Sequence, residues 1–352
     1  MIPIYITSTT GHSGKTFLAL GLVRKLMARG HRVGYIKPIG KVPIKAGTEV
    51  YDADALFVKE TLGLEEPPEV ISPFVLTFEA QSLLLTGKLP DVKKKIMAAF
   101  RSLKKKDFVV INGSGSLFEG ALMNISPLSL MEEMDARALM VEPWRGEFSA
   151  DSLYGVHQLL GTRFIGGVIN KVPSSTDSHV RETLRPFLEK KGVRIFGVFP
   201  RERMLEAATV RQLNEILHGR VLCCEEGLDE YVENFSIGAM DVDSALSYFR
   251  RTPNKAVITG AHRSDIQLAA LETSTKCIIL TGGLPTNDVV IGRARAKGIP
   301  ILTVTDDTFT AVERIEANVG KTSIRQQEKV KRIEELMDRE FDVTRLLKAC
   351  GS

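Results

Sequence analysis

The sequence predicts an α/β protein, with a mostly parallel β-sheet covered by helices on both faces and a smaller α/β domain after it. Three observations predict this class. Short apolar runs alternate with helical stretches along most of the chain. The runs are continuously apolar, as strands buried on both faces of a parallel sheet are. A glycine-rich turn joins the first run directly to the first helix, which suits a chain of strand–helix units.

The first part of the chain supplies six of these runs. The helix predicted over residues 16–29 carries Leu18, Leu22 and Leu26 on one face, and Gly30 follows it, as glycine often follows a helix. The predicted strands cover residues 4–8, 32–37, 108–111, 138–141, 164–169 and 192–199.

The strand–helix alternation restarts after about residue 220 and predicts a second unit. Three more apolar runs, each followed by a helical stretch, cover residues 255–259, 276–280 and 300–305. A predicted helix ends at Gly219, so we expect one domain over residues 1–218 and a second over residues 219–352. The charged stretch from Thr322 onward predicts a terminal helix of the second domain.

Composition and charge narrow the function classes. With 352 residues, 43% hydrophobic and 26% charged, the chain suits about two globular domains. A net charge of +4 without a long basic stripe argues against nucleic acid as a partner. Four cysteines without a C-x-x-C pair fit a reducing compartment, and the first apolar run is too short for a signal peptide or a membrane span. We therefore expect a soluble, cytoplasmic protein with no membrane partner.

The turn after the first run has the composition of a phosphate-binding loop, which makes the first domain P-loop NTPase-like. Glycines let main-chain N–H groups point at an anion, and the following helix adds the positive end of its dipole. Lys15 supplies a cation for the phosphates of ATP, and Thr16 supplies a hydroxyl for Mg²⁺. Thr9 stands where the strict motif has glycine, and the competing interpretation is a helix cap without a ligand. The predicted nucleotide-binding residues of the loop are Gly11, His12, Ser13, Gly14, Lys15 and Thr16.

Charged residues near the end of the second predicted strand provide further candidates. Lys37 lies at that end, and the carboxyl ends of strands form the ligand rim in open α/β sheets. A lysine there is well placed for a second anion. Asp52 and Asp54 are alternative Mg²⁺ ligands, directly or through water. The competing interpretation of this segment is a surface turn.

Together these residues resemble the dethiobiotin synthetase family of P-loop proteins, and most closely the dethiobiotin-synthetase-like domain at the N-terminus of long bacterial phosphotransacetylases. The second half resembles the DRTGG domain that follows in those enzymes. The first resemblance rests on residues 10–16, 34–38, Asp54, 166–171 and 197–200. The second rests on residues 238–240, 257–266 and 278–283.

The resemblance implies roles for individual residues. It implies phosphate and Mg²⁺ binding by Lys15 and Thr16, stabilisation of the transferred groups by Lys37, and a metal-binding carboxylate at Asp54. It makes Asn170 the residue that reads the adenine edge, and it implies a homodimer. Lys15 and Lys37 are therefore the candidate catalytic residues.

One position departs from the family pattern. The family has a Glu-Gly pair after the strand at 108–111, and that Glu is a metal ligand, whereas this sequence has Asn112 and Gly113. An amide carries no charge to hold Mg²⁺, which weakens the case for phosphoryl transfer more than the case for nucleotide binding. Glu119, in the following loop, is a candidate substitute.

The second half offers a further candidate ligand site at the ends of its strands. Its turns could present N–H groups to a small anionic or nucleotide effector, and an arginine there could pair with a phosphate or carboxylate. The alternative is a set of tight turns needed for packing, with Arg263 bonded to Asp265. The candidate residues are Arg263, Asp265, Thr281, Gly282 and Gly283.

Three functions remain open at this point. The first is an ATP-binding regulatory or ligand-sensing protein without acetyltransferase activity, because the catalytic domain of the phosphotransacetylases would follow beyond Ser352. The second is a Mg²⁺–ATP-dependent ligase of dethiobiotin synthetase type that acts on a small amine or carboxylic acid. The third is a structural homodimer with a vestigial nucleotide site. Enzymatic activity, as a weak ATPase or a ligase, is left open.

Overall fold

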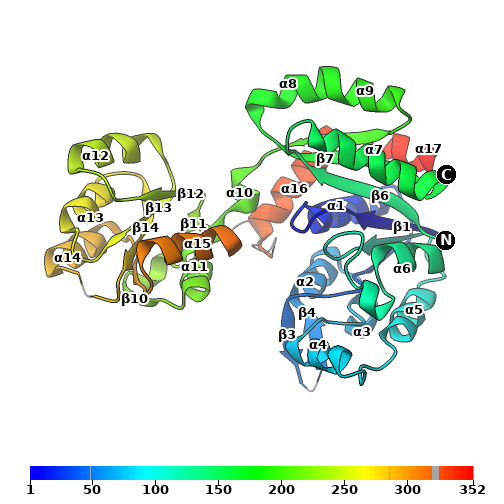
Figure 1. Ribbon diagram of the computed structural model, residues 1–352, viewed down its shortest axis with the longest axis horizontal. Helices are drawn as coiled ribbons and strands as arrows, with labels where there is room; N and C mark the ends of the chain where they lie inside the picture. The colour runs from blue at the N-terminus through cyan, green and yellow to red at the C-terminus, as the bar shows by residue number, and fades with distance from the viewer. Residues whose placement is uncertain (48, 285, 319–324, 352) are drawn as a thin grey trace. The chain divides into compact units, whose positions relative to one another are not determined.

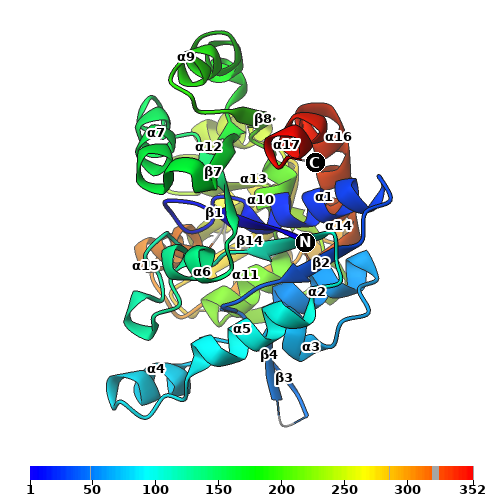
Figure 2. The same ribbon diagram turned by 90° about the vertical axis from the view of Figure 1, so that its right-hand side faces the viewer.

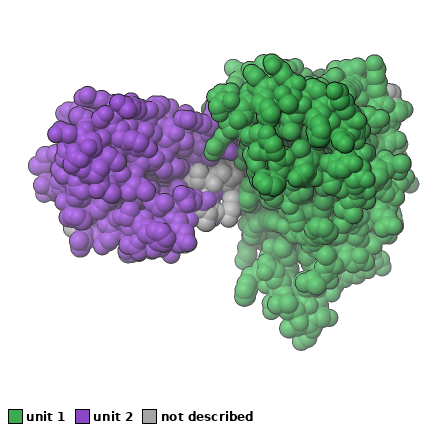
Figure 3. All heavy atoms as spheres, turned by 45° about the horizontal axis from the view of Figure 1, so that its top comes forward, with its two compact units in different colours: residues 1–201, 323–352 green, residues 202–322 purple. Residues whose placement is uncertain are grey.

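The chain folds into two units, each with its own β-sheet. The structure, a computed structural model, describes residues 1–47, 49–284, 286–318 and 325–351. Unit 1 comprises residues 1–201 and 323–352, and unit 2 comprises residues 202–322 (Figures 1 and 3). Unit 2 is thus an insertion between two parts of unit 1 in the sequence.

Unit 1 is built around a six-stranded parallel sheet in the order β2–β5–β1–β6–β7–β8. The central strand β1 pairs Tyr5 with Ile111 on one side and with Ala138 on the other. The apolar runs of the sequence explain this sheet, because its strands are buried on both faces. The strands are β1 (Ile2–Thr7), β2 (Val33–Ile36), β5 (Phe108–Asn112), β6 (Arg137–Pro143), β7 (Phe164–Val172) and β8 (Ile195–Pro200).

Helices cover both faces of this sheet, which confirms the predicted α/β class (Figures 1 and 2). One face packs on a core that includes Ile96, Leu130, Leu153 and Leu188. The helices of that face are α5 (Val92–Ser102), α6 (Pro127–Glu133), α7 (Phe148–Leu160) and α9 (Arg185–Lys190). Helix α1 (Lys15–Met27) contacts β1, β2 and β5, and its buried face carries Leu18 and Leu22 as predicted.

Smaller elements surround the sheet of unit 1. An antiparallel hairpin leads into the first of several short helices that follow β2. These elements are β3 (Pro43–Ala46), β4 (Glu49–Asp52), α2 (Ala53–Leu62), α3 (Pro68–Ile71), α4 (Phe78–Leu85), α8 (Asp177–His179) and a π-helical turn η4 (Val180–Leu184).

The C-terminal helices belong to unit 1, which differs from the domain division expected from the sequence. Helix α16 (Gln327–Glu340) packs against α1, where a Cβ on Gly21 would come within 2.4 Å of the Met337 side chain. Arg24 of α1 forms an ion pair with Glu334. Helix α17 (Val343–Ala349) contacts β8. Thr322, where the terminal helix was expected to begin, lies outside the described residues.

Unit 2 contains a five-stranded sheet in the order β10–β15–β14–β13–β12, in which β10 is antiparallel to β15 and the other pairs are parallel. Helices lie on both faces, which confirms the second α/β domain. The strands are β10 (Arg220–Cys223), β12 (Asn234–Ile237), β13 (Lys255–Gly260), β14 (Thr275–Thr281) and β15 (Ile301–Thr303). The helices are α11 (Val210–Leu217), α12 (Val242–Arg251), α13 (Ser264–Leu271), α14 (Asp288–Lys297) and α15 (Thr308–Asn318).

The unit 2 sheet has two edge strands, β10 and β12, that lie outside the three apolar runs predicted for this unit. Both are short and only half-buried, so they lack the continuous apolar run that revealed the others. Helix α11 also joins this unit, because Val210, Leu213 and Leu217 are part of its core. Among the described residues, every helix is too short or too polar to cross a lipid bilayer.

Candidate functional site

The predicted phosphate loop connects β1 to α1 at the carboxyl edge of the unit 1 sheet. Gly14 adopts a left-handed backbone with φ of +102° immediately before the helix, and His12 is also left-handed, with φ of +53°. The main-chain N–H groups of Gly14, Lys15 and Thr16 have no hydrogen-bond acceptor among the described residues. Open N–H groups at a helix N-terminus form a site that favours an anion.

Lys15 lies inside this loop and donates to four oxygens. Its Nζ is 2.7 Å from Ser8 Oγ, 3.1 Å from the Thr10 carbonyl, 3.3 Å from Ser13 Oγ and 2.7 Å from the Gly115 carbonyl. All four acceptors are neutral, and only 8% of the residue is exposed. The ammonium is therefore buried, and none of its four hydrogen-bond acceptors is a carboxylate.

The surroundings of Lys15 weaken its hold on a proton. Burial and the nearby positive charge of Lys41 lower the pKa of Lys15 from 10.5 to about 8, against the opposing effect of Glu119. The hydrogen-bond acceptors of the buried ammonium are all neutral, so the negative charges that act on it do so from a distance. An anion bound in the loop would place a negative charge in contact with it and raise the pKa again.

Asn170, predicted to read an adenine edge, supports the phosphate loop in this structure. It lies on β7, and its Nδ2 donates to the Ser13 carbonyl at 2.8 Å, while its Oδ1 accepts from the Lys171 N–H at 2.9 Å. A Cβ on Gly14 would lie 2.2 Å from that Nδ2. Glycine at position 14 thus lets the amide approach the loop, and both ends of the Asn170 amide are engaged within the chain.

Lys37, the second candidate catalytic residue, is buried after β2 and is held by a carboxylate. Its Nζ lies 2.7 Å from Asp52 Oδ1 and 3.7 Å from Asp54 Oδ2. Asp52 also caps α2 by accepting from the Ala55 N–H, and it accepts from the Val42 N–H. Burial alone would raise the pKa of Asp52, but Lys37 and these main-chain donors hold it below its usual value. Of the two aspartates, Asp52 is therefore a structural partner of Lys37.

Asp54, the predicted metal carboxylate, is paired with cations in this structure. Its carboxylate lies between Lys37 and Arg325, whose Nε is 3.5 Å away. Among the described residues, no group of three or more His, Cys, Asp or Glu side chains is close enough to hold a metal ion. A Mg²⁺ ion would therefore rely on few protein ligands, as Mg²⁺ at nucleotide phosphates commonly does.

Asn112 lies where the family pattern led us to expect a metal-binding Glu, at the end of β5. Its Nδ2 is 3.2 Å from Thr16 Oγ1 and 3.0 Å from the Tyr35 hydroxyl, and its Oδ1 is buried without a partner among the described residues. The Thr16 hydroxyl and the orphaned amide oxygen are neutral oxygen ligands that fit Mg²⁺. Water and phosphate oxygens would supply the remaining ligands.

Two carboxylates, Glu119 and Glu142, lie near the loop. Glu119 pairs with Lys41 at 2.5 Å, and its carboxylate lies over Gly115, so the proposed substitute is close to the Lys15 acceptors. Glu142, which the sequence reading missed, is fully buried at the end of β6 and accepts from Thr9 Oγ1 at 2.9 Å. Its position as the one acid of an apolar run, at a strand carboxyl end, was the available signal.

The candidate residues of unit 2 form hydrogen bonds and ion pairs with one another and with neighbouring residues of the same unit. The Gly282 and Gly283 N–H groups donate to the carbonyls of Asp306 and Val304 at 2.9 and 2.8 Å. Arg263 forms a two-point ion pair with Asp265, at 3.0 Å for each bond. Thr281 Oγ1 lies 2.9 Å from Thr308 Oγ1. These contacts are the ones expected of packing turns, and they leave the two glycine N–H groups occupied.

Comparisons with known proteins agree with the two units. A phosphate acetyltransferase of Nitratidesulfovibrio vulgaris is 25% identical over 97% of this chain and 51% of its own length. The ATP-dependent dethiobiotin synthetase BioD of Clostridium perfringens is 27% identical over 61% of this chain and 98% of its own length. The chain thus spans about half the length of that acetyltransferase. A solved structure of the cell division ATPase MinD from Pyrococcus furiosus is 18% identical and covers 58% of this chain and 85% of that chain, with a TM-score of 0.38.

Two family matches divide the chain between them. Residues 212–318 match the DRTGG domain. Residues 3–209 match an AAA domain, and this match covers more than half of the chain and includes the whole phosphate loop. The protein therefore belongs to this AAA domain family of P-loop proteins, with a DRTGG domain following the P-loop domain and with relatives among phosphate acetyltransferases and dethiobiotin synthetases.

Proposed function

We propose that this protein binds Mg²⁺–ATP in its phosphate loop and acts as a regulatory or ligand-sensing nucleotide-binding protein. The observation that carries the proposal is the buried Lys15 ammonium, whose four hydrogen-bond acceptors are neutral, beside N–H groups that have no acceptor among the described residues. A polyphosphate satisfies both, since it supplies anionic oxygens to the lysine and to the open amides.

The Mg²⁺ part of the proposal rests on Thr16 and Asn112. The Thr16 hydroxyl and the unpartnered Asn112 Oδ1 would hold the ion at the phosphates, where its charge would offset that of ATP. Two neutral ligands bind Mg²⁺ more weakly than a carboxylate does, which favours nucleotide binding with slow or no turnover.

The domain order supports a regulatory role. The acetyltransferase of N. vulgaris aligns over 97% of this chain, which covers both units. We propose that unit 2 senses a metabolite or mediates assembly and that the nucleotide state of unit 1 is part of the signal. A homodimer is part of this proposal, and light scattering of the purified protein tests it.

A second candidate function is an ATP-dependent ligase acting on a small amine or carboxylic acid. The observation that favours it is the alignment with the C. perfringens dethiobiotin synthetase over 98% of that enzyme, together with Lys37 in the rim of the site. Asn112 counts against it, because a phosphoryl-transfer site gains much from a charged metal ligand.

One pair of measurements separates these functions. The melting temperature is measured with ATP, with and without Mg²⁺, and ADP release is then followed with bicarbonate and a panel of small diamines and dicarboxylic acids. A ligand that binds only the folded state raises the melting temperature. A rise without ADP release supports the sensor, and ADP release stimulated by one amine or acid supports the ligase. An unchanged melting temperature with every nucleotide would refute both.

A further inference from the structure

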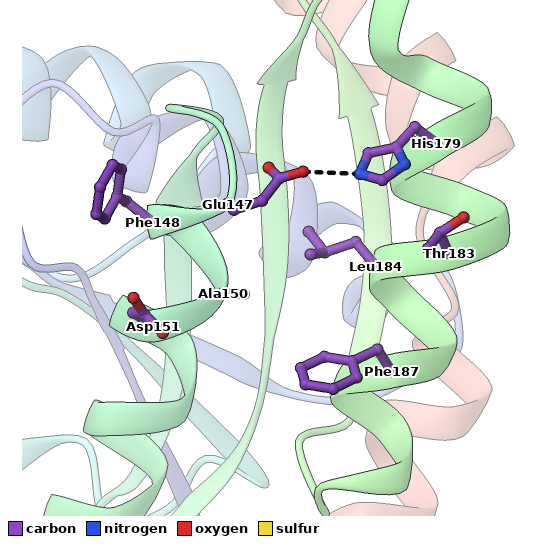
Figure 4. Close-up of a pocket in the computed structure, with 8 residues that line it drawn as sticks. All are labelled: Glu147, Phe148, Ala150, Asp151, His179, Thr183, Leu184 and Phe187. Atoms are coloured by element: carbon purple, nitrogen blue, oxygen red, sulfur yellow. Dashed lines mark hydrogen bonds and ion pairs between the residues drawn. The ribbon is translucent and has the colours of Figure 1, made fainter.

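A pocket of unit 1, apart from the phosphate loop, lies between α7 and the helical segment from α8 through η4 to α9. Its volume is about 380 Å³, within the range of roughly 300–1,000 Å³ typical of small-molecule sites. Figure 4 shows the α7 residues on one side and the residues of the other segment facing them. The lining residues are Glu147, Phe148, Ala150, Asp151, His179, Thr183, Leu184 and Phe187. None of these eight belongs to the phosphate loop.

The lining of this pocket is mostly carbon. The Phe187 ring, 54% exposed, points from its helix toward α7, whereas the ring of Phe148, 75% exposed, points away from Phe187 (Figure 4). Leu184 and Ala150, also in the lining, are buried. Part of the wall that carries Phe187 is the π-helical turn η4, an irregularity that often accompanies functional sites. An occupant with an apolar or aromatic body would cover the Phe187 ring.

The charges of the lining are negative and only partly compensated. Glu147 Oε1 lies 3.0 Å from His179 Nε2 across the mouth of the pocket (Figure 4). Asp151, one turn further along α7, has no ion pair among the described residues. The N-terminus of α7 would by itself favour an anion, but these two carboxylates already provide that negative charge. A ligand anion would be repelled, whereas a cation would have Asp151 and the Phe187 ring as partners.

We propose that this pocket binds a small organic ammonium ion, with its apolar body against Phe187 and its charged group beside Asp151. The ammonium gains a carboxylate partner and a cation–π contact, and its body removes the exposed Phe187 ring from water. This proposal does not depend on nucleotide binding, because the pocket and the phosphate loop share no residue.

The protein carries its own reporter for this pocket. Trp144 is the single tryptophan of the sequence, and its ring lies 6.5 Å from the His179 ring. Its fluorescence can be titrated with three compounds of similar size. These are 2-phenylethylamine, which is cationic at neutral pH, 2-phenylethanol, which is neutral, and 3-phenylpropionate, which is anionic.

We expect the amine to bind about fivefold more tightly than the alcohol, as one exposed cation–π contact with a carboxylate partner allows, and the carboxylate to bind more weakly than both. The Asp151→Asn variant should lose the preference for the amine. Glu182→Gln is the matched control, because Glu182 is an exposed carboxylate of η4 that does not line the pocket, and it should keep the preference.

Several results would overturn the proposal. Equal affinities for the three compounds, tighter binding of the carboxylate, or a preference for the amine that survives in Asp151→Asn would each contradict it. So would the lack of any saturable change in fluorescence. A normal melting-temperature response to ATP in the same samples would show that the phosphate loop is intact, so that failure here leaves the nucleotide proposal standing.

Discussion

The two units each contain a glycine-containing turn that leads from a strand toward a helix, and the two turns use their main-chain N–H groups in opposite ways. In the phosphate loop, the N–H groups of Gly14 and Lys15 have no acceptor among the described residues. In unit 2, the N–H groups of Gly282 and Gly283 donate to carbonyls next to β15. A glycine-rich turn after a strand is therefore not enough to identify an anion site. An anion site also requires that the N–H groups of the turn are not already hydrogen-bonded within the fold.

The two units also each contain a buried lysine with a lowered pKa, Lys15 in unit 1 and Lys255 in unit 2. Burial lowers the pKa of Lys255 on β13 to about 8, as for Lys15. Lys255 donates to Thr273 Oγ1 at 2.9 Å and lies 5.4 Å from the centre of the Phe249 ring. A lowered lysine pKa thus accompanies both a candidate site and a packed core.

The largest expected effect concerns the lysine of the phosphate loop. Lys15→Ala should weaken ATP binding about a hundredfold, since it removes a buried cation that makes charge-assisted hydrogen bonds. Arg263→Ala, in the unit 2 turn, should leave ATP binding unchanged because Arg263 is paired with Asp265. Isothermal titration calorimetry measures both. Equal losses in the two variants would break the distinction between the turns.

The second largest effect concerns stability, because replacing Gly14 should cost more free energy of unfolding than replacing Gly282. At Gly14, with φ of +102°, an added Cβ would meet Asn170, whereas at Gly282, with φ of +91°, it would meet nothing within 4 Å. Gly14→Ala should lower the free energy of unfolding of unit 1 by about 2–4 kcal/mol, from backbone strain and a lost hydrogen bond. Gly282→Ala should lower that of unit 2 by only about 1 kcal/mol. Urea denaturation followed by circular dichroism tests this, and a similar cost at both sites would contradict it.

The pH dependence of nucleotide binding should follow Lys15. Its pKa of about 8 in the free protein means that the ammonium is already charged below pH 8, so affinity is flat there. Above pH 8 a proton must be taken up with the nucleotide, so affinity should fall by up to about tenfold per pH unit. Lys255→Met is the control, because it removes another lysine of similar pKa and should leave the profile unchanged. An affinity that stays flat to pH 10 would argue that Lys15 does not contact the phosphates.

The smallest effect should come from the metal side of the loop. Asn112→Asp places a carboxylate next to Thr16, so Mg²⁺ should enhance ATP binding about fivefold more than in the natural protein. Without Mg²⁺ the same variant should be less stable, because a buried charge replaces an amide that donates two hydrogen bonds. Calorimetric titrations at several Mg²⁺ concentrations measure the difference, and exposed Asn124→Asp serves as control. An unchanged Mg²⁺ response would place the ion elsewhere.

Much of the fold could be predicted from the sequence because buried parallel strands leave continuous apolar runs. All six strands of the main sheet of unit 1 and three strands of the five-stranded sheet of unit 2 have such runs. Strands β10 and β12 are short edge strands without them. The place of α16 could not be predicted either, since its apolar face shows that it packs but not which helix it packs on.

The site was predictable as a position but not as a set of contacts. The loop, Lys15 and Thr16 follow from a strand–turn–helix pattern. The partners of Asn170, Asp52 and Asp54 depend on which side chains meet at the carboxyl edge of the sheet, and spacing in the sequence does not contain that information. Glu142 was not predicted, because it is the single acidic residue of an otherwise mostly apolar strand, and that pattern indicates the strand without giving the acid a role.

The insertion of unit 2 between residues 201 and 323 has a practical consequence for dissecting this protein. A fragment truncated after the AAA domain match at residue 209 would lose α16 and α17, and the side of α1 that faces Met337 would be laid bare to solvent. Excising residues 202–322 and joining the flanks with a glycine–serine linker would keep those helices. An internal deletion, and not a simple truncation, is therefore the way to obtain the P-loop unit alone.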